Sequence, residues 1–275
     1  MLTALSSGVS GLENFQQEMD VIGNNIANIN TTAFKAGIVN FSDAFSDTLQ
    51  GAGLTTPAMQ VGTGVKISSI TNNWNEGALS NTGVTSNLAI SGNGFFTVDD
   101  TVNNTQYVTQ DGTFSVNAAG NLVTANGYYV MGYNNSALSN VGPITITAPT
   151  GLSMVSYTIS SQGIISVTDS SGATTVVGQV LLQNFAAPQM LVSQGSNLYS
   201  NQSNAGPTVT TSTVGGAPGA SGLGTIQSGA LESSNVDLSN EMANLITAQQ
   251  AFDANSKIIT TTNEVLQTLV QMKQG

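Results

Sequence analysis

The sequence contains no histidine, no cysteine and no arginine, so all four of its basic residues are lysines. Histidine and cysteine supply the commonest general base, a strong nucleophile and most zinc ligands. Their absence excludes a Ser-His-Asp triad, a cysteine nucleophile, a histidine-bearing metal site and any disulfide. We therefore expect no catalytic residue, no bound metal and no cofactor.

Charge of either sign is scarce, since charged residues make up 7% of the chain and the formal net charge is -11. Ordinary globular domains carry roughly 25% charged residues. The lysines do not cluster along the chain, although binding to nucleic acid or to an anionic membrane surface needs grouped basic residues. They are Lys35, Lys66, Lys257 and Lys273. We expect no nucleic-acid partner, and a neutral polar surface on which copies of the chain can pack closely.

Long apolar runs are also missing. The first residues lack the basic start and continuous apolar stretch of a secretory signal peptide, and no run of about 18 apolar residues follows. We expect no membrane insertion, and export, if it occurs, without a cleaved signal peptide.

Both ends of the chain carry apolar residues spaced by three and four, a heptad-like pattern that predicts one long amphipathic helix at each end. The predicted packing positions are Leu5, Val9, Leu12, Phe15, Met19, Ile22, Ile26, Leu238, Met242, Leu245, Phe252, Ile259 and Leu266. A neighbouring stripe consists of Ala251, Ile258, Val265 and Met272. Such stripes could form the core of one helical hairpin. Because the flanking faces carry little charge, we favour packing between copies of the chain.

The middle of the chain changes to a period of two, with short apolar alternations such as Leu88–Ile90, Phe114–Val116 and Val155–Ile159. Gly-containing turn signals, such as Asn126-Gly127 and Ser171-Gly172, separate these runs. This pattern predicts an antiparallel all-β domain, either a sandwich or a distorted barrel.

The expected fold class is thus α+β, with long N- and C-terminal helices paired in a coiled-coil-like domain around a mainly antiparallel β domain. We place the helical domain at residues 1–33 and 236–275, an extended arm at 34–60, and the β domain at 61–235. Residues 201–224 are rich in Gly, Ser and Thr and are expected to form a mobile loop or linker.

Two acidic segments suggest a site but have simpler interpretations. Asp99 and Asp100, with Asn103 and Asn104, suggest a calcium loop, but their spacing does not fit an EF-hand and favours a solvated hairpin loop. Trp74 beside Glu76 is the only candidate for a hydrolase that uses carboxylates alone. The other acids are dispersed, so we expect a protein that is not an enzyme.

Residues 20–35 read DVIGNNIANINTTAFK and resemble the N-terminal signature of the flagellar rod and hook protein family. The matching residues are Asn24, Asn25, Ala27, Asn28, Thr31, Phe34 and Lys35. Ala33 departs from the family, in which glycine is usual before the phenylalanine. The C-terminal segment, from GTIQSGALESSN onward, is similar to the family's C-terminal helix, and the segments GNGFFTV and QDGTFSVNAAGNL match its middle.

The resemblance implies a structural subunit that is exported through the flagellar type III apparatus. Such proteins polymerise helically around a central channel, which their terminal helices line, and they transmit torque. The implied partners are further copies of the chain, neighbouring flagellar axial proteins, the hook cap and the export apparatus, in the hook and basal body of the flagellum.

The choice between hook and distal rod rests on weaker features. The chain is too short for the extra outer β domain of many hook proteins, which suits a distal rod or a short hook. Its C-terminal segment and the VMGY at residues 130–133 look more like a hook. We favour a hook subunit, with a distal rod subunit as the alternative and a secreted β-rich adhesin or surface-layer protein as a more distant one.

Overall fold

The computed structural model of the protein describes residues 2–50, 59–101, 103, 105–147, 153–200, 202–209 and 214–274. The chain forms two compact units. The first, called here the helical unit, comprises residues 1–29, 36–73 and 236–275. The second, the β unit, comprises residues 30–35 and 74–235.

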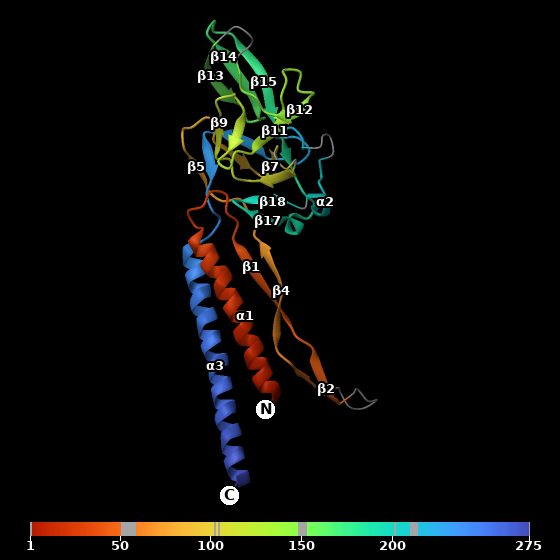
Figure 1. Ribbon diagram of the computed structural model, residues 1–275, viewed down its shortest axis with the longest axis vertical. Coiled ribbons are helices and arrows are strands. Elements are labelled where there is room, and N and C mark those ends of the chain that lie inside the picture. The colour runs from red at the N-terminus through yellow and green to blue at the C-terminus, as the bar shows by residue number, and fades with distance from the viewer. Residues whose placement is uncertain are drawn as a thin grey trace. The chain divides into compact units, whose positions relative to one another are not determined.

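Two long helices dominate the helical unit, α1 (Leu2–Ala27) and α3 (Leu238–Gln274), as the heptad pattern predicts (Figure 1). Asp237 caps α3, because its Oδ1 accepts hydrogen bonds from the backbone N–H groups of Ser239 (2.8 Å) and Asn240 (3.3 Å). At the same end of the pair, α1 stops just before Asn28, whose side chain donates to the carbonyl of Asn24 at 2.9 Å.

Two glycines of α1 allow the helices to approach each other closely. A Cβ at Gly8 would lie 3.2 Å from Cγ1 of Ile259, and one at Gly11 would lie 2.8 Å from Nδ2 of Asn255. Glycine is a poor helix former, so its use here exchanges helix propensity for close packing of α1 on α3.

A twisted two-stranded ribbon completes the helical unit. β1 (Gly37–Asp43) pairs antiparallel with β4 (Val65–Asn72), and β2 (Ser46–Gln50) pairs with β3 (Met59–Gly62). The ribbon contacts α1, where the rings of Phe15 and Phe41 lie 5.7 Å apart.

This ribbon differs from the arm that we expected at residues 34–60, because the ordered pairing continues to Asn72. Its strands alternate weakly and expose residues on both faces, so the period-two signal is faint. Residues 51–58, which belong to the predicted connector, lie outside the described residues.

A twelve-stranded sheet forms most of the β unit. Along its main path the order is β13-β14-β15-β11-β7-β8-β18-β17, and β9, β10, β12 and β16 branch from it. The path strands are β13 (Met154–Ile159), β14 (Ile164–Asp169), β15 (Thr174–Val180), β11 (Tyr129–Tyr133), β7 (Phe95–Asp100), β8 (Thr105–Thr109), β18 (Leu198–Ser200) and β17 (Val192–Gly195). The branching strands are β9 (Phe114–Val116), β10 (Leu122–Thr124), β12 (Val141–Pro143) and β16 (Leu182–Gln183).

Shorter elements complete the β unit. β6 (Leu88–Ser91) pairs with β19 (Thr225–Ser228), and β5 (Leu79–Asn81) pairs with β20 (Ala230–Glu232). A short 3-10 helix, η1 (Pro188–Met190), and the single-turn helix α2 (Gln202–Ala205) lie between strands.

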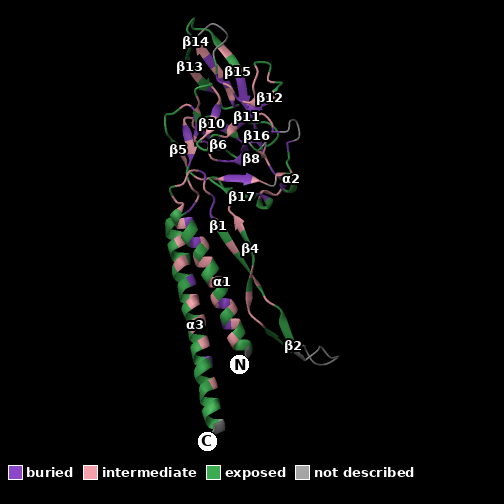
Figure 2. Cartoon of the chain, in the orientation of Figure 1, coloured by how far each residue is buried: buried purple, intermediate pink, exposed green. Residues whose placement is uncertain are grey.

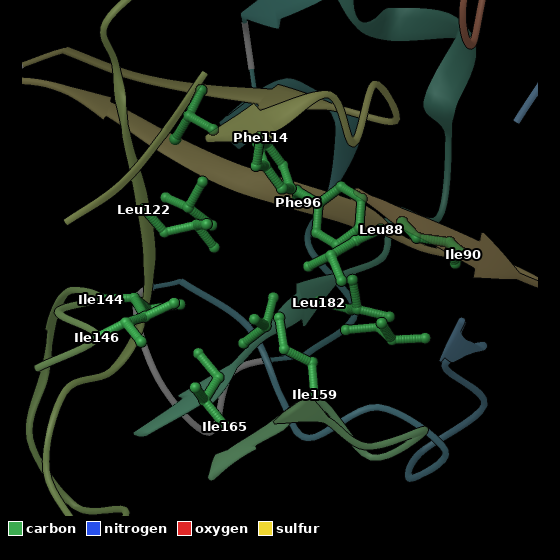
Figure 3. Close-up of a cluster of buried hydrophobic side chains, with 14 of the residues drawn as sticks. Leu88, Ile90, Phe96, Phe114, Leu122, Ile144, Ile146, Ile159, Ile165 and Leu182 are labelled. Carbon is green, nitrogen blue, oxygen red and sulfur yellow. The ribbon is translucent and has the colours of Figure 1, made fainter. Parts of the chain in front are cut away.

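The core of the β unit is built from side chains that the period-two pattern selects. Leu88, Phe96, Leu122 and Ile165 are among its fully buried members (Figure 3). The predicted turns are present, for example at Gly127 (φ 84°) between β10 and β11. Every pairing in the sheet is antiparallel, as expected.

The described residues of the segment 201–224, which are 202–209 and 214–224, pack within the β unit, whereas composition predicts a mobile linker. Among its described residues, Val209 and Leu223 are buried in the main core, and Val214 packs with Met131 and Leu181. Its few apolar side chains hold it against the sheet, although small polar residues dominate its composition.

No helix among the described residues combines the length and the apolar character needed to cross a lipid bilayer.

Candidate functional site

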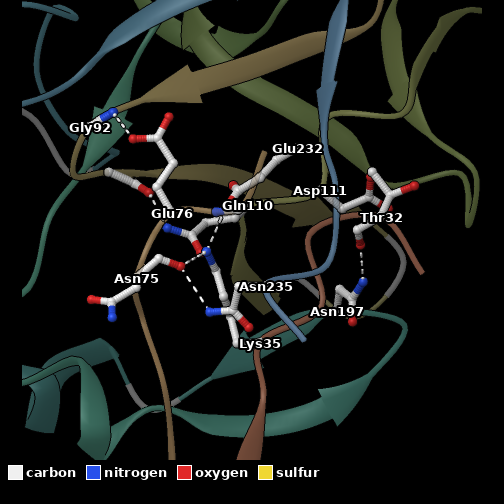
Figure 4. A network of polar contacts seen from close by, with 12 residues as sticks. Thr32, Lys35, Asn75, Glu76, Gly92, Gln110, Asp111, Asn197, Glu232 and Asn235 are labelled. Atoms are coloured by element: carbon white, nitrogen blue, oxygen red, sulfur yellow. Dashed lines mark hydrogen bonds and ion pairs between the residues drawn. The ribbon is translucent and has the colours of Figure 1, made fainter. Parts of the chain in front are cut away.

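Residues 30–35, called here the anchor segment, follow α1 but belong to the β unit. Hydrogen bonds tie the segment to two distant parts of that unit (Figure 4). The N–H of Ala33 donates to the carbonyl of Glu232 at 2.9 Å, and the amide of Asn197 donates to the carbonyl of Thr32 at 2.6 Å. The second half of the family signature therefore fixes the chain to the β unit.

Lys35 is the last residue of the anchor segment, and its side chain forms a buried ion pair with Glu232. Its Nζ lies 2.7 Å from Oε1 of Glu232, and the two side chains are 1% and 3% exposed. Nζ also donates to the carbonyl of Asn75 at 3.0 Å, and the N–H of Gly77 donates to the same carboxylate oxygen at 2.7 Å. Nearly complete burial makes each charge dependent on the other, because an uncompensated buried charge is strongly unfavourable.

Asn25, from the first half of the signature, has a comparable role in the helical unit. It is buried, and its amide exchanges two hydrogen bonds with the backbone of Gly37, at 2.8 and 2.9 Å. Its Nδ2 also lies 3.2 Å from Oε1 of Glu241 on α3. Asn25 thus joins α1, β1 and α3, and burial of Glu241 raises the pKa of that carboxyl group.

The structure therefore divides the predicted signature residues between two sites. Asn24 and Ala27 are exposed on α1, whereas Phe34 is half-buried in the anchor segment. Sequence reasoning missed Glu232, Asn197 and Glu241 as partners. The acidic side chain of Glu232 is the only sequence signal for its pairing with Lys35, and it is weak because the two residues are 197 positions apart.

Ala33 occupies a left-handed backbone conformation, with φ of 54°, and is 2% exposed. Residues other than glycine rarely adopt this conformation, because Cβ approaches the following carbonyl at a cost of about 1–2 kcal/mol. The geometry gives a physical reason for the glycine that the family usually has at this position.

Ala33→Val is expected to destabilise the β unit by about 2 kcal/mol, since a β-branched side chain fits neither the positive φ nor the tightly packed surroundings. Ala33→Gly should leave stability unchanged or raise it by up to about 1 kcal/mol, because relief of strain is partly offset by the entropy of glycine. Urea unfolding of both variants measures these effects. Equal stability of the two variants would contradict the assigned conformation.

The acidic cluster considered for calcium lies at the β7–β8 hairpin, as the simpler interpretation predicts. Asn103 donates from Nδ2 to Oδ2 of Asp100 at 2.7 Å. Burial, and secondarily the charge of Asp100, raises the pKa of Asp99. Asn104 lies outside the described residues. Among the residues described, no group of three or more Asp or Glu side chains is arranged to hold a metal ion.

Trp74 and Glu76, the candidate hydrolytic pair, both make contacts within the β unit. The indole packs edge-on against Phe95 and Tyr199, with ring centroids 5.2 and 5.0 Å away. Burial there raises the pKa of Tyr199 to about 12. Glu76 accepts a hydrogen bond from the N–H of Gly92 at 3.0 Å. The ring therefore belongs to an aromatic cluster of the β unit.

Asp111 provides a pH-dependent contribution to stability. Burial raises its pKa, although hydrogen bonds from the N–H and hydroxyl of Thr113, both at 3.0 Å, act in the opposite direction. Because the folded-state pKa is above the unfolded value of about 3.9, the stability contribution is complete below that value and is lost as pH rises through the folded pKa.

Asp111→Asn is therefore expected to raise the melting temperature at pH 7 more than at pH 3.5, which thermal unfolding across this range measures. Asp169→Asn is the matched control with the opposite sign, since a hydrogen bond from Ser171 lowers the pKa of Asp169. The stability due to Asp169 is present above its unfolded pKa and is lost as pH falls through its folded pKa. A lower melting temperature of Asp111→Asn at pH 7 would contradict the assignment.

Comparison with known protein families finds three matches along the chain. Residues 5–35 match the family described as flagella basal body rod protein. Residues 89–167 match the flagellar hook protein FlgE/F/G D1 domain. Residues 227–272 match the C-terminal region of the flagellar basal body rod FlgEFG proteins.

Several relatives that match over nearly their full length are rod proteins. The flagellar basal-body rod protein FlgG of Bacillus subtilis (strain 168) is 42% identical, with 100% of both chains covered. FlgG of Borreliella burgdorferi is 34% identical over 97% of both chains. The flagellar hook protein FlgE of B. burgdorferi is 44% identical, but over only 48% of this chain and 31% of that protein. The solved Helicobacter pylori hook protein FlgE2 is 17% identical over 49% of this chain, with a TM-score of 0.24 that supports no structural argument.

These relatives correct our preference for a hook, because full-length similarity supports the distal rod alternative better. The C-terminal region matches a family described for FlgE, FlgF and FlgG together, so this match does not distinguish a hook from a rod. The chain belongs to the flagellar rod and hook protein family, whose members are structural components of the bacterial flagellum.

Proposed function

We propose that the protein is a subunit of the distal rod, which polymerises with copies of itself into a tube that transmits torque. The full-length rod relatives support the rod in preference to the hook. The observation that carries polymerisation is an uncovered apolar stripe on α3. Transmission of torque is a mechanical role, and the family implies no catalysis.

The apolar stripe comprises Ile258, Val265 and Met272, which are seven residues apart and therefore lie on one side of α3. All three are exposed, and Met272 is 75% exposed. Figure 2 shows that exposed residues dominate the C-terminal half of α3. The predicted seam residues Leu245, Phe252, Ile259 and Leu266 are only half-exposed. The stripe is thus distinct from the seam and is available to other copies of the chain.

The lengths of the two helices strengthen this interpretation. α3 has 37 residues and α1 has 26, so α3 is longer by about 16 Å at 1.5 Å per residue. Leu269 and Val270 are also exposed near its C-terminal end. Contiguous exposed apolar surface of this kind marks an interaction site.

Not all predicted packing positions are available for contacts between subunits. Ile22 is buried within the helical unit, and Phe15 packs on Phe41 of the ribbon. Val9, Leu238 and Met242 are exposed and remain candidates for contacts between subunits. The other predicted positions that the structure describes are half-buried.

The ribbon offers a second contact surface. Phe45 is 88% exposed, and its ring lies 5.8 Å below the ammonium group of Lys66. The ribbon strands β3 and β4 also expose apolar side chains, those of Met59, Val61 and Ile70. We infer that the ribbon contacts adjacent copies and restricts sliding between them.

Further partners of the protein would be neighbouring axial proteins, the hook cap and the export apparatus.

Ser171→Cys tests the location of the protein directly. Ser171 is exposed in the β14–β15 turn, and the natural chain has no other cysteine. We expect maleimide-gold on purified hook–basal bodies to label the rod between the rings and the base of the hook. Label along the curved hook would support the hook alternative, and absence of label from both parts would contradict an axial role. The unsubstituted chain controls for nonspecific labelling.

A further inference from the structure

Sulfur in this chain is confined to methionine, because the sequence contains eight methionines and no cysteine. Peroxides oxidise thioethers to sulfoxides, and without a thiol no side chain of the protein competes strongly for them. Exposure then decides which methionine reacts first. Met131 is 8% exposed and packs with Leu181 and Val214. Met272 is 75% exposed and is therefore far more accessible to a dissolved oxidant.

Met272 occupies the C-terminal position of the apolar stripe on α3. It follows Val265 by seven residues and Ile258 by fourteen, so the three side chains share one side of the helix. This stripe is the surface that we propose for assembly, and the inference drawn here rests on that proposed function. Each contact of the stripe with another copy would bury the Met272 thioether in apolar surroundings.

Oxidation would change the chemistry of this position without changing the sequence. One oxygen atom passes from hydrogen peroxide to the thioether sulfur, which loses two electrons, and the peroxide is reduced to water. The product is a polar sulfoxide whose oxygen accepts hydrogen bonds. Ile258 and Val265, its neighbours on the stripe, carry no side-chain donor for that oxygen. Burial of a polar atom without a partner is unfavourable, so the sulfoxide opposes contact between copies.

We propose that Met272 is an oxidation site that controls assembly, with a small peroxide as the oxidant. The sulfoxide keeps the chain monomeric. A methionine sulfoxide reductase reverses the change, because it returns the sulfoxide to the thioether at the expense of a dithiol, which becomes a disulfide as water is released. In the polymer the thioether is covered by another copy, so chains that have already assembled are protected.

The test compares polymerisation of the full-length protein before and after the monomer is treated with hydrogen peroxide. Mass spectrometry of its peptides should show an added oxygen at Met272 well before one at Met131. We expect the critical concentration for polymerisation to rise by about tenfold or more, since the sulfoxide disrupts an apolar contact. Methionine sulfoxide reductases A and B with dithiothreitol should reverse this rise.

Met272→Leu removes the thioether and keeps an apolar side chain of similar volume. Whatever the critical concentration of this variant before treatment, peroxide should change it by less than about twofold, because leucine has no oxidisable sulfur. Met190→Leu is the matched control, since Met190 is 57% exposed but lies in η1 of the β unit, away from the stripe. It should respond to peroxide as the unsubstituted chain does.

Three results would overturn the inference alone. They are failure of Met272 to gain oxygen, an unchanged critical concentration once it has gained oxygen, and a full response to peroxide in Met272→Leu, which would assign the effect to another methionine. Absence of polymers from the untreated chain is a different outcome. It would contradict the proposed function itself, and the inference would fall with it.

Discussion

Replacing Ile258, Val265 and Met272 together by glutamine is expected to abolish polymerisation while leaving the monomer folded. Glutamine is at least as good a helix former as isoleucine or valine, so α3 should persist. Complete burial of each apolar side chain would contribute about 1.5–3 kcal/mol. Three such losses at every contact in a polymer reduce the affinity between subunits by several orders of magnitude. Sedimentation and electron microscopy measure the loss of polymers.

A control variant replaces Thr260 and Asn263 by glutamine. Both are exposed on α3 two and five residues after Ile258, which places them on the side of the helix away from the stripe. The control should keep its helix content and still polymerise. Normal polymers from the stripe variant would show that the stripe does not mediate assembly.

Lys35→Met is expected to destabilise the β unit by about 3–5 kcal/mol, because it leaves the buried Glu232 carboxylate without its counter-charge. Urea unfolding monitored by the fluorescence of Trp74, which lies in the same unit, measures this loss. Adding Glu232→Gln should restore most of the stability, since the amide oxygen can still accept from the N–H of Gly77. This recovery separates an ion-pair effect from a packing effect.

Lys66→Met provides a comparison at an exposed lysine of the ribbon. Lys66 faces only the ring of Phe45 among the described aromatic residues, a contact that contributes about 0.5–1 kcal/mol at an exposed site. Its effect should therefore be several times smaller than that of Lys35→Met. Similar effects of the two substitutions would contradict a special role for the buried pair.

The sequence predicted the elements whose periodicity is strong. The spacing of Leu245, Phe252 and Ile259 identified α3, and the alternation at Leu88 and Ile90 identified β6. These patterns arise because one face of each element must leave water. Local chemistry also located the turn at Gly127.

Pairings between distant parts of the chain could not be predicted. The ribbon escaped recognition because its apolar residues, such as Phe45 and Val61, face solvent in the isolated chain. The packed segment 201–224 escaped because its polar composition hides the buried Val209 and Leu223. A single sequence cannot reveal that Lys35 meets Glu232, since no local pattern links residues so far apart.

Electron microscopy of the purified full-length protein at high concentration tests the central claim most directly. If the terminal helices assemble the chain into a rod, the concentrated protein should form tubes of uniform diameter with a central channel. The stripe variant at the same concentration should remain monomeric. A concentrated, folded protein that forms only monomers, closed small oligomers or amorphous aggregates would contradict the proposed role as a self-assembling axial subunit.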